Sequence, residues 1–353
     1  TITLAIGVQR MARRNAIIRR LPAVETLGSV TVICSDKTGT LTRNEMTAQQ
    51  VLTSDATFQV SGAGYAPHGG FVLDGRDAPV AEHPELIDIG RVASLCNDAS
   101  LHADGREWHL NGDPTEGALV TLAMKAGLDP AFEREALPRT DAIPFESEHR
   151  FMASLHHDHA GSAIILLKGA PEVVLGLCAW ERRAGEAAPL HRAAWLQRAD
   201  AAAAAGMRLI AVAMRLLGQR RVLTFVDVEA GDFTLLAVVG IADPPRDEAI
   251  DAVAACRSAG IRVKMITGDH AGTAQSIGAK LGLGEPLRVV TGAELEALDD
   301  AALADVAHAA QVFARASPEH KLRLVQALQS CGAVVAMTGD GVNDAPALKR
   351  DDV

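Results

Sequence analysis

No apolar run in this 353-residue sequence reaches the roughly 18 to 20 residues needed to cross a bilayer, and no secretory signal is recognisable. Positive charge is also scarce, because 34 Lys and Arg stand against 44 Asp and Glu, which gives a net charge of −10. A general nucleic-acid binder depends on Lys and Arg to neutralise phosphates, so we expect no nucleic-acid partner. We expect a soluble chain that recruits a cation wherever it handles phosphates.

Cysteine is scarce as well. The five thiols are odd in number, far apart and never arranged as CxxC, which predicts reduced, mostly structural cysteines of a cytosolic protein. The composition is that of a folded chain, since 48% of the residues are hydrophobic and 22% are charged. A chain of this length is expected to form two domains with substantial cores.

The sequence begins without an initiator methionine. Its first six residues are mostly apolar, and five arginines follow closely: Arg10, Arg13, Arg14, Arg19 and Arg20. This order is typical of the cytoplasmic end of a membrane helix, although an amphipathic basic helix on a soluble surface has the same pattern. We therefore expect residues 1–25 to be a stalk segment that follows a membrane helix in a longer protein.

Four short apolar segments are followed directly by polar or glycine residues, which is the pattern of buried parallel strands: 30–34, 262–266, 312–314 and 333–337. Helical patterns lie between the last three, at 247–258, 273–281 and 319–329. This alternation predicts an α/β fold with a doubly wound parallel sheet.

In such a sheet, ligands bind at the carboxyl ends of the strands. The polar residues that follow the predicted strands should therefore surround one crevice: Asp36, Thr267, Asp269, Arg315, Asp340, Asn343 and Asp344. Residues 48–240 separate the first strand from the others, and their turn-rich texture predicts an inserted α+β domain. The sheet domain would then consist of residues 26–47 and 241–353.

The strongest local pattern is Ser-Asp-Lys-Thr-Gly-Thr-Leu-Thr at residues 35–42, at the end of the first predicted strand. A carboxylate at that place, Asp36, suits nucleophilic attack on a bound phosphoryl group, because threonine hydroxyls and the N–H groups of a glycine turn surround it. An ordinary Asx turn after a strand is the alternative.

A second pattern, Thr-Gly-Asp-Gly-Val-Asn-Asp at residues 338–344, places two acids and an Asn in a glycine-permissive loop. Hard oxygen ligands of this kind suit Mg²⁺. Two unit charges 4 Å apart repel by about 4 kcal/mol at an effective dielectric constant near 20. Asp36 and Asp340 would therefore repel a triphosphate without a cation, and the sequence predicts a magnesium site.

Taken together, residues 35–42, the Thr267-Gly268-Asp269 triplet, Lys321 and residues 338–344 resemble the P-type ATPases of the haloacid dehalogenase superfamily. The resemblance covers nearly the whole chain. It implies that Asp36 accepts the γ-phosphate of ATP and that Lys321 neutralises the transferred group. It also implies that Mg²⁺ is held by Asp36, the Thr38 carbonyl and Asp340.

The resemblance assigns further roles in the same crevice. Thr267, Gly268 and Asn343 would donate hydrogen bonds to the phosphoryl oxygens, Asp344 would orient Lys321, and Asp269 would belong to the catalytic set. These are positioning and electrostatic roles, as phosphoryl transfer requires.

In the insertion, residues 113–119 and 168–172 are similar to the nucleotide site of the family. The resemblance implies that Phe145 stacks on adenine, that Glu116 approaches the base, and that other residues line the pocket or reach the nucleotide: Arg150, Lys168, Arg208, Asp243, Arg246 and Arg315. A buried core aromatic is the alternative for Phe145. No Walker A sequence is present, so nucleotide binding rests on the resemblance.

Thr38 bears on the lifetime of the phosphoenzyme. In soluble phosphatases of the superfamily an Asp typically stands two residues after the nucleophile and acts as general acid and base. A threonine cannot exchange a proton near neutral pH, so the aspartyl-phosphate is expected to persist.

For the parent protein the resemblance implies ATP-dependent cation transport at the cytoplasmic face of a membrane. Residues 168–172 and 243–246 are similar to those of calcium-like and sodium/potassium-like pumps. The implied partners are a transmembrane domain and an actuator domain that this chain lacks. The alternatives are a soluble haloacid dehalogenase-type phosphatase with a large cap and a non-enzymatic nucleotide-binding module.

Two further features receive no catalytic role. His156, His157 and His159 are expected to be solvated residues of a hairpin, because zinc ligation needs more and better-placed ligands. Cys34 lies near Asp36, but strand alternation is expected to turn it away from the crevice or into the core.

Overall fold

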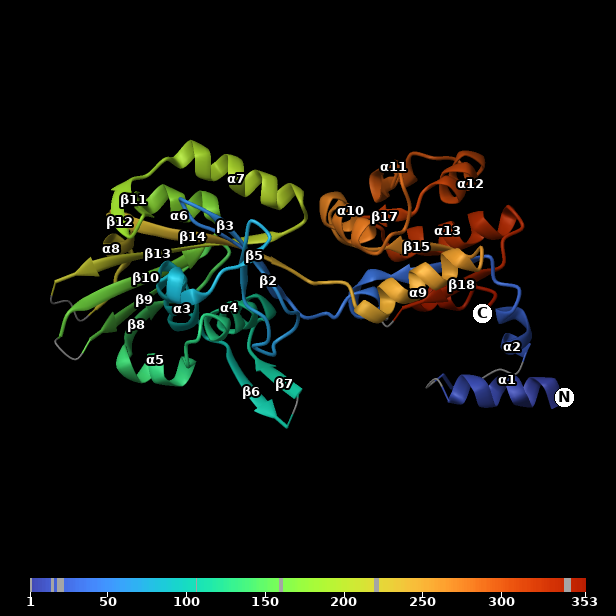
Figure 1. Cartoon of the computed structure of the whole chain (residues 1–353). Helices are drawn as coiled ribbons and strands as arrows, with labels where there is room; N and C mark the ends of the chain where they lie inside the picture. Colours follow the sequence, from blue (N-terminus) through green and yellow to red (C-terminus); the bar gives the residue numbers. More distant parts are fainter. Residues whose placement is uncertain are drawn as a thin grey trace. The chain divides into compact units, whose positions relative to one another are not determined.

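The computed structural model describes residues 2–13, 16–17, 22–105, 107–158, 161–218, 222–339 and 344–353. The chain divides into two compact units (Figure 1). The parallel-sheet unit consists of residues 1–44 and 245–353, and the inserted unit consists of residues 45–244. A mixed α/β fold with a parallel sheet and a separate, mostly antiparallel sheet confirms the predicted fold class.

The parallel-sheet unit contains five parallel strands in the order β16-β17-β15-β1-β18. Their bounds are β1 Val32–Asp36, β15 Arg262–Ile266, β16 Val289–Thr291, β17 Val312–Ala314 and β18 Val335–Thr338. The predicted bounds of β15 and β17 are confirmed. β1 lies two residues later than predicted, so Asp36 is the last residue of the strand, and the sequence did not predict β16.

Helices cover both faces of this sheet: α9 Asp247–Ser258, α10 Ala271–Lys280, α11 Gly292–Glu296, α12 Asp300–Ala309, α13 Pro318–Ser330 and α14 Ala345–Leu348. On one face Met265 belongs to a core with Ile277 of α10. On the other face its neighbour Ile266 belongs to a core with Leu303 and Leu324. Because successive strand residues point to opposite faces, this alternation produces the doubly wound arrangement.

The start of the chain is helical, with α1 at Ile2–Ala12 and α2 at Pro22–Leu27. Among the described residues, no helix combines the length and apolar character needed to span a membrane. Of the five arginines in the predicted stalk segment, Arg14, Arg19 and Arg20 lie outside the described residues. The stalk assignment stays a prediction.

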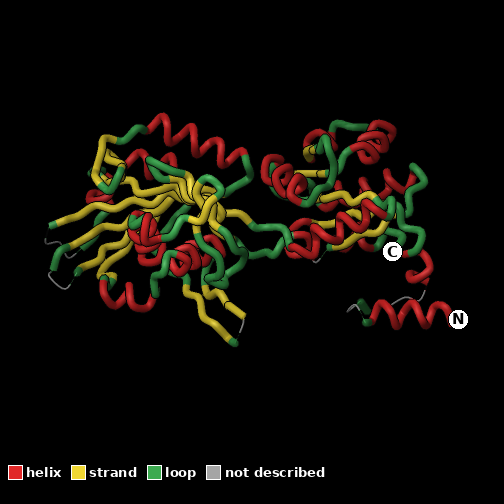
Figure 2. Tube along the Cα trace, in the orientation of Figure 1, coloured by secondary structure: helices red, strands yellow, loops and turns green. Residues whose placement is uncertain are grey.

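The inserted unit is built on an eleven-stranded sheet, drawn in yellow in Figure 2, whose main path is β5-β4-β3-β2-β14-β13-β10-β9-β8, with β11 and β12 beside β14. The strand bounds are β2 Thr47–Leu52, β3 Thr57–Val60, β4 Phe71–Leu73, β5 Arg76–Asp77, β8 Arg139–Ile143, β9 Phe151–His157, β10 Ala163–Gly169, β11 Cys178–Arg183, β12 Glu186–Pro189, β13 Arg208–Leu217 and β14 Phe233–Ala242. A separate hairpin is formed by β6 Ser100–Asp104 and β7 Glu107–Asn111.

Helices also cover both faces of the large sheet: α3 Glu85–Leu95, α4 Pro114–Lys125, α5 Pro130–Ala136, α6 Pro171–Leu177, α7 Arg192–Ala204 and α8 Phe225–Glu229. Leu86 of α3 and Leu119 of α4 belong to one core. Val174 of α6 and Trp195 of α7 belong to a second core. In Figure 1, α3 and α4 lie on the opposite side of the sheet from α6 and α7.

The start of α4 is fixed by its sequence. The Asp113 carboxylate accepts hydrogen bonds from the backbone N–H groups of Thr115 at 2.8 Å and Glu116 at 3.3 Å. Pro114 occupies the first helical position, where a missing N–H costs nothing. Glu116 is therefore held in the first turn, where the helix dipole favours a carboxylate.

The prediction of solvated histidines is wrong for His156, which is 1% exposed. One of its ring nitrogens lies 2.9 Å from the Leu137 carbonyl oxygen, and the other lies 2.9 Å from Ser154 Oγ. The physical reason is that β9 pairs with strands on both sides and helices cover the sheet, so its side chains point into cores. His159 lies outside the described residues.

Burial of this imidazole predicts a loss of stability in mild acid. Burial lowers the pKa of His156 from 6.5 to about 4. As the pH falls, the imidazole of the unfolded chain is protonated near pH 6.5, whereas that of the folded chain is protonated only near pH 4. The free energy of unfolding is expected to be about 2 kcal/mol lower at pH 5 than at pH 7 through this group. Urea unfolding at the two pH values measures the difference.

His156→Gln should show a flatter dependence on pH by the same amount, whereas His157→Gln should keep the dependence of the unaltered chain. Equal slopes for the unaltered chain and His156→Gln would contradict the prediction.

Candidate active site

Asp36 ends β1 at the carboxyl edge of the parallel sheet, and 15% of its side chain is exposed. Its Oδ1 accepts a hydrogen bond from the Lys321 ammonium at 2.8 Å. The same ammonium donates to Oδ1 of the buried Asp344 at 2.5 Å. One cation therefore bridges two carboxylates from distant parts of the sequence, which places three of the predicted catalytic residues together.

Lys321 lies in the first turns of α13, whose N-cap Ser317 accepts a hydrogen bond from the backbone N–H of His320. Burial by itself would lower the pKa of Lys321, but the hydrogen bonds to Asp344 and Asp36 outweigh burial and raise it. The side chain is therefore an ammonium at neutral pH. An ammonium has three N–H donors, so one is left for a further oxygen next to Asp36.

Removing this ammonium is expected to destabilise the fold. In Lys321→Ala the buried Asp344 carboxylate loses its cation, and breaking a buried ion pair costs about 3–5 kcal/mol. The free energy of unfolding in urea is the measurement. The double variant with Asp344→Asn should recover part of the loss, because the more deeply buried of the two carboxylates then carries no charge. An equal or greater loss in the double variant would contradict this account.

The loops after β15 and β17 are joined by backbone hydrogen bonds. The N–H of Arg315 donates to the Asp269 carbonyl at 2.9 Å, and that of Ala316 donates to the Thr267 carbonyl at 3.0 Å. Thr267 is buried, whereas Gly268 is exposed. The structure thus brings the predicted triplet at 267–269 and Arg315 to one edge of the sheet.

Lys37 is a residue of this edge to which the sequence analysis gave no role. Its ammonium forms an ion pair with Asp269 Oδ2 at 2.8 Å, and its side chain is buried. The pair ties the loop that follows Asp36 to the loop that follows β15. The sequence feature that could have indicated a role for Lys37 is its position directly after the predicted nucleophile, Asp36.

Arg246, which precedes α9, contacts the loop that follows Asp36. Its guanidinium donates to the carbonyls of Thr42 at 2.9 Å and Gly39 at 3.0 Å. Gly39 has φ +72°, a conformation that favours glycine, and Thr38 before it is extended and exposed. Asp243 lies in the inserted unit, where its Oδ1 accepts a hydrogen bond from the Glu45 N–H at 3.3 Å. Nucleotide contacts of Arg246 and Asp243 stay predictions.

Part of the predicted metal site is not described. Asp36 and Thr38 lie in the described part of the chain, whereas Asp340 and Asn343 lie outside it. Among the described residues, no group of three or more His, Cys, Asp or Glu side chains is placed to hold a metal ion. The magnesium site therefore depends on Asp340 and stays a prediction.

Cys34 takes no part in this edge. It lies in the hydrophobic core under α12 and α13, and burial raises the pKa of its thiol to about 12. A thiol with such a pKa is not a nucleophile at neutral pH. The expectation that Cys34 points into the core is confirmed.

In the inserted unit, the structure joins several residues of the predicted nucleotide site. Lys168 at the end of β10 forms a close ion pair with Glu116, and both side chains are largely buried. Glu116 also accepts a hydrogen bond from the Asp98 N–H at 3.2 Å. Next to Glu116, Thr115 accepts a hydrogen bond from the Arg208 guanidinium at 2.9 Å. One helix turn thus connects three of the predicted residues.

Phe145 and Arg150 lie on the segment that leads into β9. Phe145 is 55% exposed, so it is not the buried core aromatic that the sequence left as an alternative. Arg150 pairs with Glu172 at 2.7 Å. The segment passes close to β10, since a Cβ on Gly169 would lie 2.5 Å from the Arg150 carbonyl oxygen. Only glycine fits at this position.

The chain is similar to known proteins in two comparisons. Residues 85–248 match the family described as P-type ATPase, cytoplasmic domain N. Over its whole length the chain is 50% identical to the probable cation-transporting ATPase F of Mycobacterium tuberculosis. It is 40% identical to a calcium-transporting ATPase of Bacillus subtilis and to the human calcium-transporting ATPase type 2C member 1.

The chain spans 40% of the length of the two bacterial relatives and 37% of the human one. The similarity includes both units, because the alignments cover 100% of the chain. The aligned region therefore includes Asp36, Lys321 and Asp344, which meet at one edge of the parallel sheet. Residues 85–248 therefore match the N domain of P-type ATPases, and the relatives that align with the whole chain at 40–50% identity are named cation-transporting or calcium-transporting ATPases.

Proposed function

We propose that the whole protein uses ATP to transport a cation across a membrane, and that Asp36 of this chain accepts the γ-phosphate. The observation that carries the proposal is the Asp36 carboxylate at a strand end, held by a buried ammonium that also bonds Asp344. The names of the relatives support cation transport, and neither comparison supports a soluble phosphatase.

In the proposed step an oxygen of Asp36 forms a bond to the γ-phosphorus, while the bond from that phosphorus to the bridging oxygen of ADP breaks. The electron pair of the broken bond leaves with ADP. Lys321 engages Oδ1, so we assign the attack to Oδ2. Negative charge spread over the three equatorial oxygens is stabilised by the ammonium of Lys321.

P-type ATPases use ATP with Mg²⁺, and the residues of this edge suit that ion. Mg²⁺ prefers oxygen ligands, and the proposed set consists of the Asp36 carboxylate, the Thr38 carbonyl and Asp340. The ion, when bound, neutralises negative charge between the carboxylates and the phosphates. Lys37 holds Asp269 at the same edge, where Thr267, Gly268, Asn343 and Arg315 are proposed to position the phosphoryl group.

The inserted unit is proposed to bind the nucleotide. Phe145 offers an exposed ring for adenine, while Glu116 and Lys168 form a largely buried polar pair that can hold a base or ribose. Arg150 and Arg208 would supply positive charge toward the phosphates. Both guanidinium groups are fixed by hydrogen bonds in the structure, to Glu172 and Thr115 respectively.

Truncation of the exposed ring tests this assignment. Phe145→Ala is expected to weaken ATP binding about ten-fold, since stacking of a base on an aromatic ring contributes about 1–3 kcal/mol. Isothermal titration with ATP measures the change. Phe132→Ala is the matched control, because Phe132 is 66% exposed in the same unit and has no predicted role. Equal affinities of the two variants would refute the assignment of Phe145.

The phosphoryl transfer itself is tested by labelling. The chain is mixed with γ-labelled ATP and Mg²⁺, quenched in acid and treated with hydroxylamine, which cleaves acyl-phosphates. Protein-bound label that hydroxylamine removes is the expected result. Label that resists hydroxylamine, or no label when nucleotide is saturating, would contradict the proposed step. Cation transport is tested with the whole protein in sealed vesicles.

A further inference from the structure

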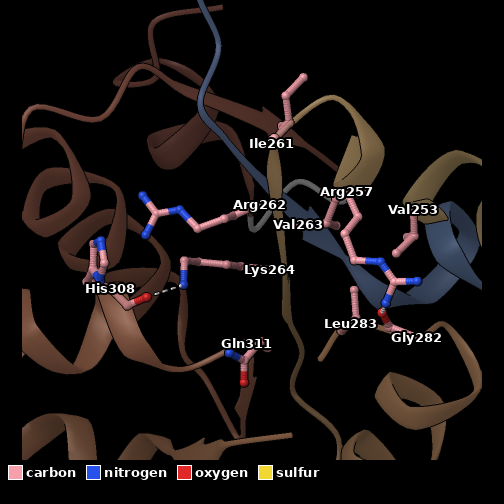
Figure 3. A pocket seen from close by; sticks show the side chains of 11 residues that line it. Val253, Arg257, Ile261, Arg262, Val263, Lys264, Gly282, Leu283, His308 and Gln311 are labelled. Carbon is pink, nitrogen blue, oxygen red and sulfur yellow. Dashed lines mark hydrogen bonds between the residues drawn. The ribbon is translucent and has the colours of Figure 1, made fainter. Parts of the chain in front are cut away.

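A cavity of the parallel-sheet unit, the basic pocket, lies at the opposite strand ends from Asp36. Its volume is about 280 Å³. Arg262 and Lys264 at the start of β15 line it, with Arg257 of α9, His308 of α12 and Gln311 (Figure 3). None of the described residues that line it is Asp or Glu, although the chain as a whole carries a net charge of −10.

The placement of Lys264 has a structural explanation. Its buried ammonium donates to the carbonyls of His308 at 3.1 Å and Ala310 at 2.5 Å, at the C-terminal end of α12, where the helix dipole favours a cation. Burial lowers the pKa of Lys264 to about 8, and the nearby charge of Arg262 acts in the same direction. Two of the three ammonium hydrogens are used, so one can reach a further acceptor.

The position of Arg262 is not explained by contacts of this kind. Residues i and i+2 of a strand share a face, so its side chain lies on the same face as Lys264. Figure 3 shows both side chains extending toward His308, whereas Arg257 extends the other way, toward Gly282. Within the described part of the chain, no hydrogen bond or ion pair engages the Arg262 guanidinium. Two like charges close together destabilise the fold unless an anion compensates them.

We propose that the basic pocket binds a small anion of the phosphate class, between the guanidinium of Arg262 and the ammonium of Lys264. A guanidinium can pair two oxygens of a phosphate at once, and the ammonium supplies a third contact. The cavity is close to the lower size limit of small-molecule sites. Val263 and Leu283 supply apolar surface in another part of the same pocket.

This site is separate from the edge at which Asp36 lies, because Arg262 begins β15 and Thr267 follows its last residue. The proposal therefore does not depend on phosphoryl transfer. Free phosphate and the phosphate group of a monoester share the same recognition chemistry. They differ in whether the apolar part of the pocket is used.

The test is a titration followed by backbone amide NMR. Inorganic phosphate is added to the 353-residue chain without nucleotide or Mg²⁺, and sodium chloride keeps the ionic strength constant. The signals of Gly260, Ile261 and Gly282 report on the pocket. Saturable shifts are expected, with affinity about ten-fold or more weaker in Arg262→Gln, since a hydrogen bond to a charged group is lost.

The matched control is Arg288→Gln, which removes the same charge from an exposed position of the same unit. It should bind phosphate like the unaltered chain. Arg262→Lys keeps the charge but loses the planar guanidinium that can pair two oxygens, so an intermediate affinity for phosphate is expected. This variant replaces Arg262→Gln in the test if Arg262→Gln fails to fold. Equal affinity of the position-262 variants and the control, or the same shifts with chloride alone, would overturn the proposal.

A parallel titration with phenyl phosphate distinguishes the two sources. Tighter binding than inorganic phosphate identifies a monoester that uses Val263 and Leu283, and equal binding identifies the phosphate group as the whole ligand.

Discussion

Changing Asp36 to Asn is expected to abolish the incorporation of hydroxylamine-labile phosphate from γ-labelled ATP. The amide has nearly the same shape as the carboxylate but is not a nucleophile, so no acyl-phosphate can form. The fold should be retained, because Lys321 keeps its ion pair with the buried Asp344. Affinity for ATP should hold or rise, since one negative charge that would face the triphosphate is removed.

The control for this experiment is Asp305→Asn, which removes the same charge from an exposed position of α12. It should be labelled as strongly as the unaltered chain. Labile phosphate on Asp36→Asn would show that another carboxylate is the acceptor. Loss of label together with loss of ATP binding would point to a binding role for Asp36, as in a nucleotide-binding module.

Changing Thr38 to Asp is expected to shorten the lifetime of the phosphoenzyme. A carboxylate two residues after the nucleophile can remove a proton from attacking water, and general base catalysis of this kind contributes about 10²- to 10⁴-fold. Thr38 is extended and exposed, so the new side chain has room at the crevice edge. The measurement is the decay of labelled protein after a chase with unlabelled ATP.

Thr38→Asn separates proton transfer from shape. Its amide matches the size of the Asp side chain but takes no proton, so its phosphoenzyme should decay at the rate of the unaltered chain. If both variants decay faster, water access and not base catalysis limits the lifetime. If neither does, Thr38 is not the residue that keeps the phosphoenzyme stable.

Features set by short stretches of sequence could be predicted. The strands at 262–266 and 312–314 and the helix at 247–258 have the predicted bounds, because apolar runs and turn residues act locally. The assembly of one sheet from segments on both sides of an insertion was also predictable, since parallel strands with polar residues after them share an edge. β16, Val289–Thr291, was not predicted.

The pairing of side chains could not be predicted in the same way. Nothing near Lys37 in the sequence indicates Asp269 as its partner, and Arg246 contacts the loop after Asp36 only because the chain returns beside it. His156 was expected in solvent, since the local histidine spacing resembles a hairpin surface. Its burial depends on strands and helices that come from other parts of the chain.

The sequence by itself determined that a parallel sheet forms, that Asp36 stands at the end of a strand, and that polar residues follow the other strands. These depend on apolar periodicity and on motifs of a few adjacent residues. Only the tertiary structure decided that Lys37 pairs with Asp269, that His156 is buried, and that Arg262 lies beside Lys264 in a pocket whose described lining residues include no carboxylate. The reason is physical: burial and charge compensation depend on which distant segments pack together, and no local pattern records that.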